Sequence, residues 1–336
     1  MSYDVITMGS ATRDIFLFLD ARDAPVIANP RADPKREKLI ALEYGAKIDV
    51  VSSARAIGGG GANAAVTFSR MGLTTAAVVR VGEDDDGNRI LDALKQERVA
   101  TAYAQRDPKL CTAFSALIVA GEKKRDRAVL TERGASSANN FSRFSRGITK
   151  AKWYYTSALS GKNWKKELRD ISQTARTHGI KWAWNPGTAQ IRAGLSALKP
   201  FMKHCSVFNV NRDEALELAG KRNSIKALLS SLLAAGPERV LVSDGINGVY
   251  CADSSAMVRM SADPSIRAME PTGAGDALGS GFIAGLVAKH DITYALDVGL
   301  TNSESVICKI GAQEGILRLR ELARAINIRK HTLSYV

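Results

Sequence analysis

The sequence has few of the residues that form disulfide frameworks or local metal sites. Its 336 residues include four histidines and four cysteines, and Cys111, Cys205, Cys251 and Cys308 lie far apart with no C-x-x-C pair. This spacing argues against a local zinc site and predicts reduced thiols, as in a cytoplasmic protein.

Long apolar runs and basic leaders are also lacking. No apolar run approaches the length that spans a membrane, and the chain enters its first strand-like run at residues 3–9. A G-x-x-x-x-G-K-[ST] motif is absent, which excludes a Walker-type nucleotide site. We therefore expect a cytoplasmic protein with no membrane partner.

Acidic residues are outnumbered by basic ones: the sequence has 34 Asp and Glu and 47 Lys and Arg, which gives a net charge of +13. The basic residues recur at 30–38, 121–127, 162–169 and 318–330, mixed with acids rather than in one block. This distribution favours a solvated basic surface that suits phosphate ligands over a nucleic-acid site. We expect no nucleic-acid partner.

Short apolar runs alternate with helical patterns along most of the chain. Strands are predicted at 5–8, 76–81, 114–119, 153–156, 182–184, 207–210 and 240–243. Helices are predicted at 62–71, 89–97, 165–177, 212–219, 225–234, 276–288 and 294–309, with a closing helix at 318–329. This alternation predicts an α/β fold with a mostly parallel sheet covered on both faces, whose ligands bind beyond the carboxyl ends of the strands.

The segment 20–49 breaks this alternation with three prolines and many charges. We interpret about 18–52, with part of 101–130, as a small β-rich lid on a single domain that spans 1–336. Edge strands of such a lid can pair between subunits, which would form a homodimer.

The stretch MEPTGAGDALGSGF, residues 269–282, sets four glycines and Asp276 where a loop becomes a helix. Glycine lets backbone N–H groups approach a ligand closely, and a helix N-terminus attracts anions. Asp276 can cap the helix, which the stretch alone favours, or can act as a base beside a bound phosphate. Leu278 stands where a dinucleotide fingerprint needs glycine, which argues against a dehydrogenase.

Three further motifs each allow a structural and a functional interpretation. IGGGGANAA, residues 57–65, is a hinge or a close approach to a ligand, and Asn63 caps a helix or binds a substrate hydroxyl. Asn211 and Glu214 fit a capping box, or hold a hydrated Mg²⁺ through water. Ser243 and Gly245 belong to a hairpin turn or to a nucleotide-phosphate loop.

Taken in order, these motifs resemble the ribokinase-like carbohydrate kinase family over nearly the whole chain, as far as residues 311–313. The resemblance implies a three-layer α/β/α sandwich with a small β-rich lid. It also implies ATP-dependent transfer of the γ-phosphoryl group to a hydroxyl of a sugar or related substrate, with Mg²⁺.

The resemblance further implies roles for individual residues. Asp276 is expected to be the general base, and the N–H groups of Gly273, Ala274 and Gly275 to form the anion hole. The expected acceptor-binding residues are Asp14, Gly58, Gly59 and Asn63. Asn211, Glu214, Ser243 and Gly245 are expected at the nucleotide, with Glu214 holding Mg²⁺ through water.

The chain departs from the family pattern at two places. The second signature commonly begins Asp-Thr, but here it reads Glu270-Pro271, which weakens the expectation of a monovalent cation, although Thr272 and the region near Gly311 could supply oxygens. Gly60 replaces the lysine that is common in ribokinase, so the resemblance does not imply a ribose acceptor. The segment 154–161 could line the acceptor pocket or end a buried strand, and we favour the strand end.

The acceptor therefore remains open among sugars, sugar phosphates, sugar acids and nucleosides. A nucleoside kinase of the same family is the alternative enzyme. A non-catalytic sugar- or nucleotide-sensing protein is the alternative from another class, and the presence of Asp276, Asn211 and Glu214 argues against it.

Overall fold

The computed structural model spans residues 1–336 and describes all of them except 1, 32–36, 122–125, 145–146 and 221. In the described chain, the larger of the sheets has nine strands in the order β17-β16-β15-β14-β13-β12-β11-β1-β6. Six run parallel, and β15, β16 and β17 add on antiparallel at one end. Their bounds are β1 Tyr3–Met8, β6 Thr75–Val78, β11 Ala151–Thr156, β12 Lys181–Trp184, β13 Val207–Asn211, β14 Val240–Ser243, β15 Val249–Ala252, β16 Met257–Met260 and β17 Leu333–Tyr335.

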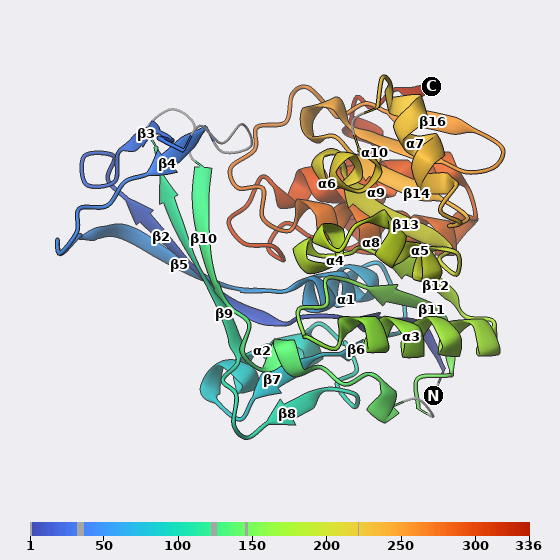
Figure 1. Ribbon diagram of the computed structural model, residues 1–336, viewed down its shortest axis with the longest axis horizontal. Coiled ribbons are helices and arrows are strands. Elements are labelled where there is room, and N and C mark those ends of the chain that lie inside the picture. Colours follow the sequence, from blue (N-terminus) through green and yellow to red (C-terminus); the bar gives the residue numbers. More distant parts are fainter. Residues whose placement is uncertain (1, 32–36, 122–125, 145–146, 221) are drawn as a thin grey trace.

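The parallel strands form because their apolar residues are buried on both faces. In β1, Val5 packs with one layer of helices while Ile6 and Met8 pack with the other. One face is covered by α3 Trp164–His178, α4 Thr188–Arg192, α5 Leu195–Met202, α6 Arg212–Ala219 and α7 Ile225–Leu233. The other is covered by α1 Gly60–Arg70, α2 Asp85–Gln96, α8 Ala274–Lys289, α9 Ile292–Val306 and α10 Leu319–Ile328. The predicted three-layer sandwich is confirmed (Figure 1).

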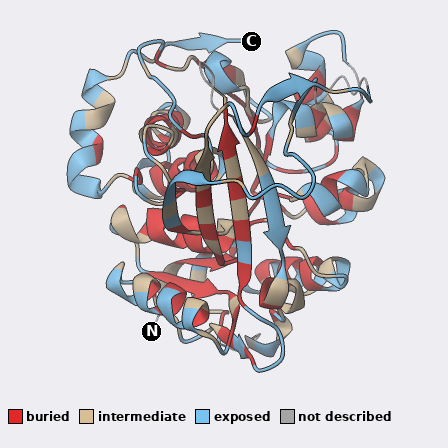
Figure 2. Cartoon of the chain, turned by 90° about the vertical axis from the view of Figure 1, so that its left-hand side faces the viewer, coloured by how far each residue is buried: buried red, intermediate tan, exposed pale blue. Residues whose placement is uncertain are grey.

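A smaller sheet projects from this body (Figure 1) and has the order β10-β9-β2-β5. Its strands are β2 Thr12–Leu19, β5 Val50–Gly58, β9 Ala113–Ala120 and β10 Asp126–Glu132. Residues of β2 and β9 alternate between buried and less buried positions, as Figure 2 shows. One face of this sheet therefore carries a small apolar cluster that includes Phe16 and Leu117.

Two short strand pairs and three short helices complete the fold. β3 Val26–Ala28 pairs with β4 Lys38–Ile40 beside the smaller sheet, and β7 Arg80–Gly82 pairs with β8 Gln105–Asp107. The 3-10 helices are η1 Gly134–Ala138, η2 Ser142–Phe144 and η3 Gly245–Asn247. Among the described residues, no helix combines the length and apolar character needed to cross a bilayer.

The predicted elements differ from the observed ones mainly where the chain leaves the larger sheet. The run 76–81 was expected to be one strand, but it forms β6 and β7, which belong to different sheets. After Val78 the chain leaves the larger sheet and pairs with β8, where Gln105 N–H donates to the Val79 carbonyl at 2.8 Å. Of the two interpretations of the segment after Ser243, the hairpin forms, since β14 and β15 pair antiparallel, while a role at a nucleotide stays a prediction.

Candidate active site

The predicted site residues gather where strands of the larger sheet end. Asn211 and Ser243 are the last residues of the parallel strands β13 and β14. The chain leaving β1 passes through Gly9 and Ser10 into β2, which carries Asp14. These carboxyl ends are where an α/β sheet binds ligands.

The glycine run before α1 allows that helix to start against the end of β1. Gly59 has a φ of 91°, which disfavours any side chain. The N–H groups of Gly61 and Ala62 donate to the Ser10 carbonyl at 3.0 and 3.1 Å. At Gly58, a side chain would collide with the Asp14 carboxylate. Because these glycines have no side chain, Asp14 and the start of α1 can lie close together at the end of β1.

Asn63, one turn into α1, is bonded to Asp276 across the site. Its Nδ2 donates to Oδ2 of Asp276 at 2.9 Å, and its Oδ1 accepts from Nε2 of Gln313 at 3.0 Å. Neither Asn63 nor Asp276 forms a side-chain cap, because Gly59 and Gly273 are the N-caps of α1 and α8. The capping interpretation of both residues is therefore wrong for this chain.

The Asp276 carboxylate lies in a confined environment. Burial raises its pKa, and the hydrogen bond from Asn63 acts in the opposite direction. Its Oδ1 lies 2.9 Å from where a Cβ on Gly60 would stand, so glycine is needed there. Burial and the charge of Asp276 together raise the pKa of the Tyr155 hydroxyl. The carboxylate is thus held in place with a raised proton affinity.

The first turn of α8 presents backbone N–H groups beside this carboxylate. Gly273 is in the left-handed conformation with a φ of 83°, and Gly275 is exposed. Within the described chain, the N–H groups of Gly273 and Gly275 have no hydrogen-bond acceptor, whereas that of Ala274 donates to the Pro271 carbonyl at 3.2 Å. The unpartnered groups suit an anion.

Asp14 lies on the buried side of β2, and its Oδ1 accepts from Thr12 Oγ1 at 3.0 Å. Burial raises its pKa, bonds from Thr12 and Ser115 lower it, and the charges of Glu270 and Asp276 raise it. The charge of Asp14 is thus coupled to that of Asp276. The structure places both predicted carboxylates in one site.

Asn211 and Glu214 form the predicted capping box at the start of α6. Asn211 N–H donates to Oε2 of Glu214 at 2.9 Å, and Glu214 N–H donates to Oδ1 of Asn211 at 2.8 Å. Burial raises the pKa of Glu214, and nearby carboxylates, including Asp276, raise it further. No group of three or more metal-ligating side chains is found in the parts of the chain that the structure describes.

Ser243 and Gly245 lie at the turn after β14. Gly245 has a φ of 53° and is exposed, and the adjacent Asp244 accepts from Arg212 Nη1 at 2.8 Å. Because Arg212 opens α6, this ion pair ties the turn to the capping box. The predicted nucleotide residues are therefore next to one another, at the ends of β13 and β14.

The structure adds residues to the site. Ser157, just after β11, is buried with its hydroxyl beside Gly60, and it lies inside the segment 154–161 already considered as a pocket lining. Asn185, just after β12, was missed from the sequence, and its Nδ2 donates to the Asn209 carbonyl at 2.8 Å. A polar residue directly after a buried parallel strand is the signal that could have found it. Gln313 and Arg127, which contact the site from distant segments, carry no such signal.

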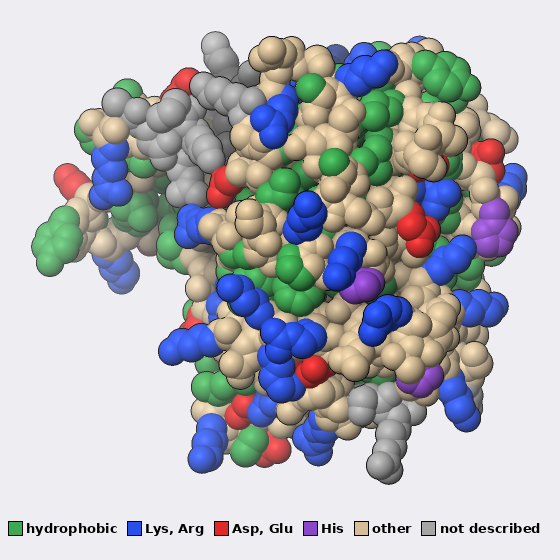
Figure 3. All heavy atoms as spheres, turned by 45° about the vertical axis from the view of Figure 1, so that its right-hand side comes forward, with side chains coloured by type: hydrophobic (Ala, Val, Ile, Leu, Met, Phe, Trp, Pro, Cys, Tyr) green, Lys and Arg blue, Asp and Glu red, His purple; other side chains and the backbone are tan. Residues whose placement is uncertain are grey.

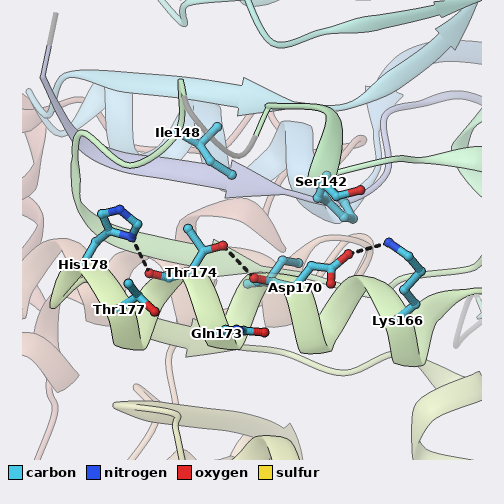
Figure 4. A pocket seen from close by; sticks show the side chains of 10 residues that line it. Ser142, Ile148, Lys166, Asp170, Gln173, Thr174, Thr177 and His178 are labelled. Atoms are coloured by element: carbon cyan, nitrogen blue, oxygen red, sulfur yellow. Dashed lines mark hydrogen bonds and ion pairs between the residues drawn. The ribbon is translucent and has the colours of Figure 1, made fainter.

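Several cavities lie beyond the cluster of predicted residues, and residues of α3 line two of them. One, of 440 Å³, runs along α3 and is lined by none of them (Figure 4). The other, of 510 Å³, is lined in part by residues 159–161, which follow the end of β11. Strand β11 ends at Thr156, so the expected strand end falls inside 154–161 and the remainder borders this cavity.

Comparison with known proteins identifies the family of this chain. The model of the pfkB family of carbohydrate kinases matches residues 31–318. An uncharacterised sugar kinase of Archaeoglobus fulgidus is 26% identical over 253 residues, covering 75% of this chain and 98% of the relative. A ribokinase of Haemophilus influenzae is 25% identical, covering 78% and 84%.

Solved structures show the same fold. The Arabidopsis thaliana ribokinase complexed with ribose and ATP aligns with a TM-score of 0.79 at 16% identity, over 98% of this chain and 100% of that one. A Burkholderia thailandensis nucleoside kinase in complex with inosine aligns with a TM-score of 0.76 at 16% identity, over 97% and 98%. Kinases of the matched family are phosphotransferases that act on an alcohol group. This chain belongs to the pfkB family of carbohydrate kinases.

Proposed function

We propose that this chain transfers the γ-phosphoryl group of ATP to a hydroxyl of a sugar, with Asp276 as the general base. The observation that carries the proposal is the Asn63–Asp276 hydrogen bond beside the free N–H groups at the start of α8. It sets a held carboxylate and an anion site side by side, which is what phosphoryl transfer needs.

In the proposed step, the acceptor oxygen attacks the γ-phosphorus while Asp276 takes the hydroxyl proton. The bond from phosphorus to the bridging oxygen breaks, and ADP leaves with that electron pair. The raised pKa of Asp276 makes its carboxylate a stronger base than an exposed aspartate. The N–H groups of Gly273 and Gly275, with Ala274 after a small rotation, would stabilise the charge on the transferring group.

The nucleotide would lie along the ends of β13 and β14. Ser243 and Gly245 would contact it there, with Asn211 and Asn185 facing its phosphates. The donor set fits Mg²⁺ held through water, because Glu214 is a half-buried carboxylate with one oxygen used by Asn211 N–H. When bound, the ion would neutralise charge on the phosphates.

The acceptor would lie between Asp14, Asn63 and Asp276, with Gly58 and Gly59 below it. Carboxylates and amides suit the hydroxyl groups of a neutral sugar. Arg127, which reaches the loop before α8, is paired with Glu270 there. Its pairing favours a neutral acceptor over a sugar phosphate or sugar acid. A nucleoside acceptor is the second candidate, favoured by the likeness to the Burkholderia enzyme.

The smaller sheet would serve as the lid of this site. Its strand β2 carries Asp14, and its apolar cluster packs against Ile310 of the main body. A lid excludes water, which otherwise competes for the γ-phosphoryl group.

The test is ADP release from MgATP with a panel of sugars, sugar phosphates, sugar acids and nucleosides, run beside Asp276→Asn. We expect turnover with one neutral class and a loss of roughly 10²–10⁴-fold in kcat in the variant. The variant should also melt at a higher temperature at pH 7, because a carboxylate with a raised pKa costs stability when ionised. Unchanged turnover in the variant would exclude Asp276 as the base.

A further inference from the structure

One ion pair joins the smaller sheet to the loop before α8. Nε of Arg127, on β10, lies 3.0 Å from Oε1 of Glu270, and the two side chains are 21% and 5% exposed. Strand β10 and this loop are far apart in the sequence. The ion pair can therefore form only when the smaller sheet lies close to the loop before α8.

The Glu270 carboxylate shapes the loop that leads to the anion site. Its Oε1 accepts from Thr272 Oγ1 at 2.7 Å and its Oε2 from Thr272 N–H at 3.0 Å. Its own N–H donates to the Ile307 carbonyl at 3.1 Å. Since Gly273 comes one residue after Thr272 and caps α8, the position of Glu270 sets where the Gly273 N–H points.

A buried carboxylate here would by itself oppose phosphate binding. Its charge already contributes to the raised pKa of Asp14, which places it within electrostatic reach of the acceptor site. An uncompensated negative charge beside a transferring phosphoryl group weakens the anion site, and a buried charge without a partner is costly. Arg127 supplies the compensating charge, and it comes from the smaller sheet.

We propose that Arg127 is a positioning residue that makes the anion site competent only when the smaller sheet lies against the main body. The inference rests on the proposed kinase function. When Arg127 is withdrawn, Glu270 repels the γ-phosphoryl group, so an open lid disfavours attack by water. By linkage, the Arg127–Glu270 contact and phosphate binding at the start of α8 favour each other, and each strengthens the other by the same factor.

The experiment compares Arg127→Met, Glu270→Gln and the double variant with the wild type, using MgATP and the best acceptor from the panel. We expect Arg127→Met to lower kcat by about 10- to 100-fold, the range of typical coupling between sites. The double variant should recover at least several-fold over Arg127→Met, because the repelling charge is gone. Arg127→Lys, which keeps the charge, should lose less than Arg127→Met.

The matched control is Arg55→Met, an exposed arginine on β5 of the same sheet, which should leave kcat unchanged. A double variant as slow as Arg127→Met, or slower, would show that the pair is merely structural and would overturn the inference. Unchanged kcat in Arg127→Met would overturn it as well, while leaving the kinase function intact. A wild type that phosphorylates no acceptor would instead remove the proposed function and the inference with it.

Discussion

At the scale of single residues, the site depends on a carboxylate that is partly buried and is restrained by a hydrogen bond. Burial favours the protonated form of Asp276, and the amide of Asn63 favours the ionised form. A base needs both effects, because too low a pKa makes it weak and too high a pKa leaves it protonated. In the proposed reaction, Asn63 would therefore adjust the pKa of the base as well as contact the acceptor.

The pH dependence tests this directly. Since the base works ionised, activity should fall as the pH drops through the raised pKa of Asp276. Asn63→Ala removes the effect that lowers this pKa, so the acid limb of kcat/KM should move to higher pH. Asn88→Ala, an exposed residue of α2, should leave the limb in place. If the acid limb of kcat/KM is unchanged in Asn63→Ala, a group other than Asp276 controls it.

Gly60 gives a second prediction at this scale. A Cβ there would lie 2.7 Å from the Cβ of Ser157 and 2.9 Å from Oδ1 of Asp276. Gly60→Ala should therefore displace the carboxylate and lower kcat by about 10²-fold, as misplacement by an ångström can do. The KM for ATP should change little, because the residue lies away from β13 and β14. An unchanged kcat would mean that the carboxylate can shift without cost.

At the scale of elements, the sequence predicted the helices and strands that are specified by neighbouring residues. Helix α8 reads as a glycine turn followed by an apolar run, and α6 as a capping box, and both formed. The glycines of α8 also have a packing role that no periodicity reveals: a Cβ on Gly281 would lie 2.9 Å from the Cα of Gly299 on α9. Contacts between distant segments, such as Asn63 with Gln313, are set by tertiary packing and leave no local pattern.

The C-terminal strand β17 is attached through a buried histidine. Nδ1 of His331 lies 2.8 Å from Oδ1 of Asp297, and its Nε2 lies 3.1 Å from Oε2 of Glu304. Burial disfavours the charged ring, but the two carboxylates outweigh it and raise its pKa to about 9. Because the folded pKa exceeds the unfolded value of about 6.5, this stabilisation is complete below pH 6.5 and is lost as the pH rises through 9.

We therefore expect the melting temperature of the wild type to fall between pH 7 and pH 10 more steeply than that of His331→Gln. At pH 6 the variant should be less stable by roughly 1.5–3 kcal/mol, the contribution of hydrogen bonds to a charged group. His178→Gln, at the exposed end of α3, serves as the control. Parallel melting curves for wild type and His331→Gln across this range would contradict the assignment.

At the scale of the whole molecule, the site is built from two sheets. The larger sheet supplies the strand ends and helix N-termini, and the smaller one supplies Asp14 and Arg127. The alternation of strands and helices was enough to predict the larger sheet, whereas the register that sets Arg127 beside Glu270 was not predictable from either segment. Lys and Arg outnumber Asp and Glu on the face in Figure 3, in keeping with the net charge of +13.

Apolar side chains are exposed on the smaller sheet and on the adjoining β3–β4 pair. Val51 on β5 is 69% exposed and Leu130 on β10 is 57% exposed. Ile27 on β3 is 46% exposed, and Tyr44, in the segment after β4, is fully exposed. Strands β5 and β10 are the edges of this sheet within the described chain. Exposed apolar edges favour pairing with another strand, and a two-fold axis lets a second copy of the same sheet provide it.

We therefore predict a homodimer that forms through the smaller sheets. Sedimentation velocity should give twice the chain mass for the wild type and a monomer for the double variant Val51→Lys and Leu130→Lys, because charges at the two edges of the sheet oppose pairing. Ile328→Lys, which adds the same charge at a 66% exposed position of α10, should remain a dimer. A monomeric wild type would exclude the dimer, and a double variant that stays dimeric would place the interface on another face. Since Asp14 and Arg127 lie on strands of the same sheet, dimer formation would also restrain the part of the molecule that closes the site.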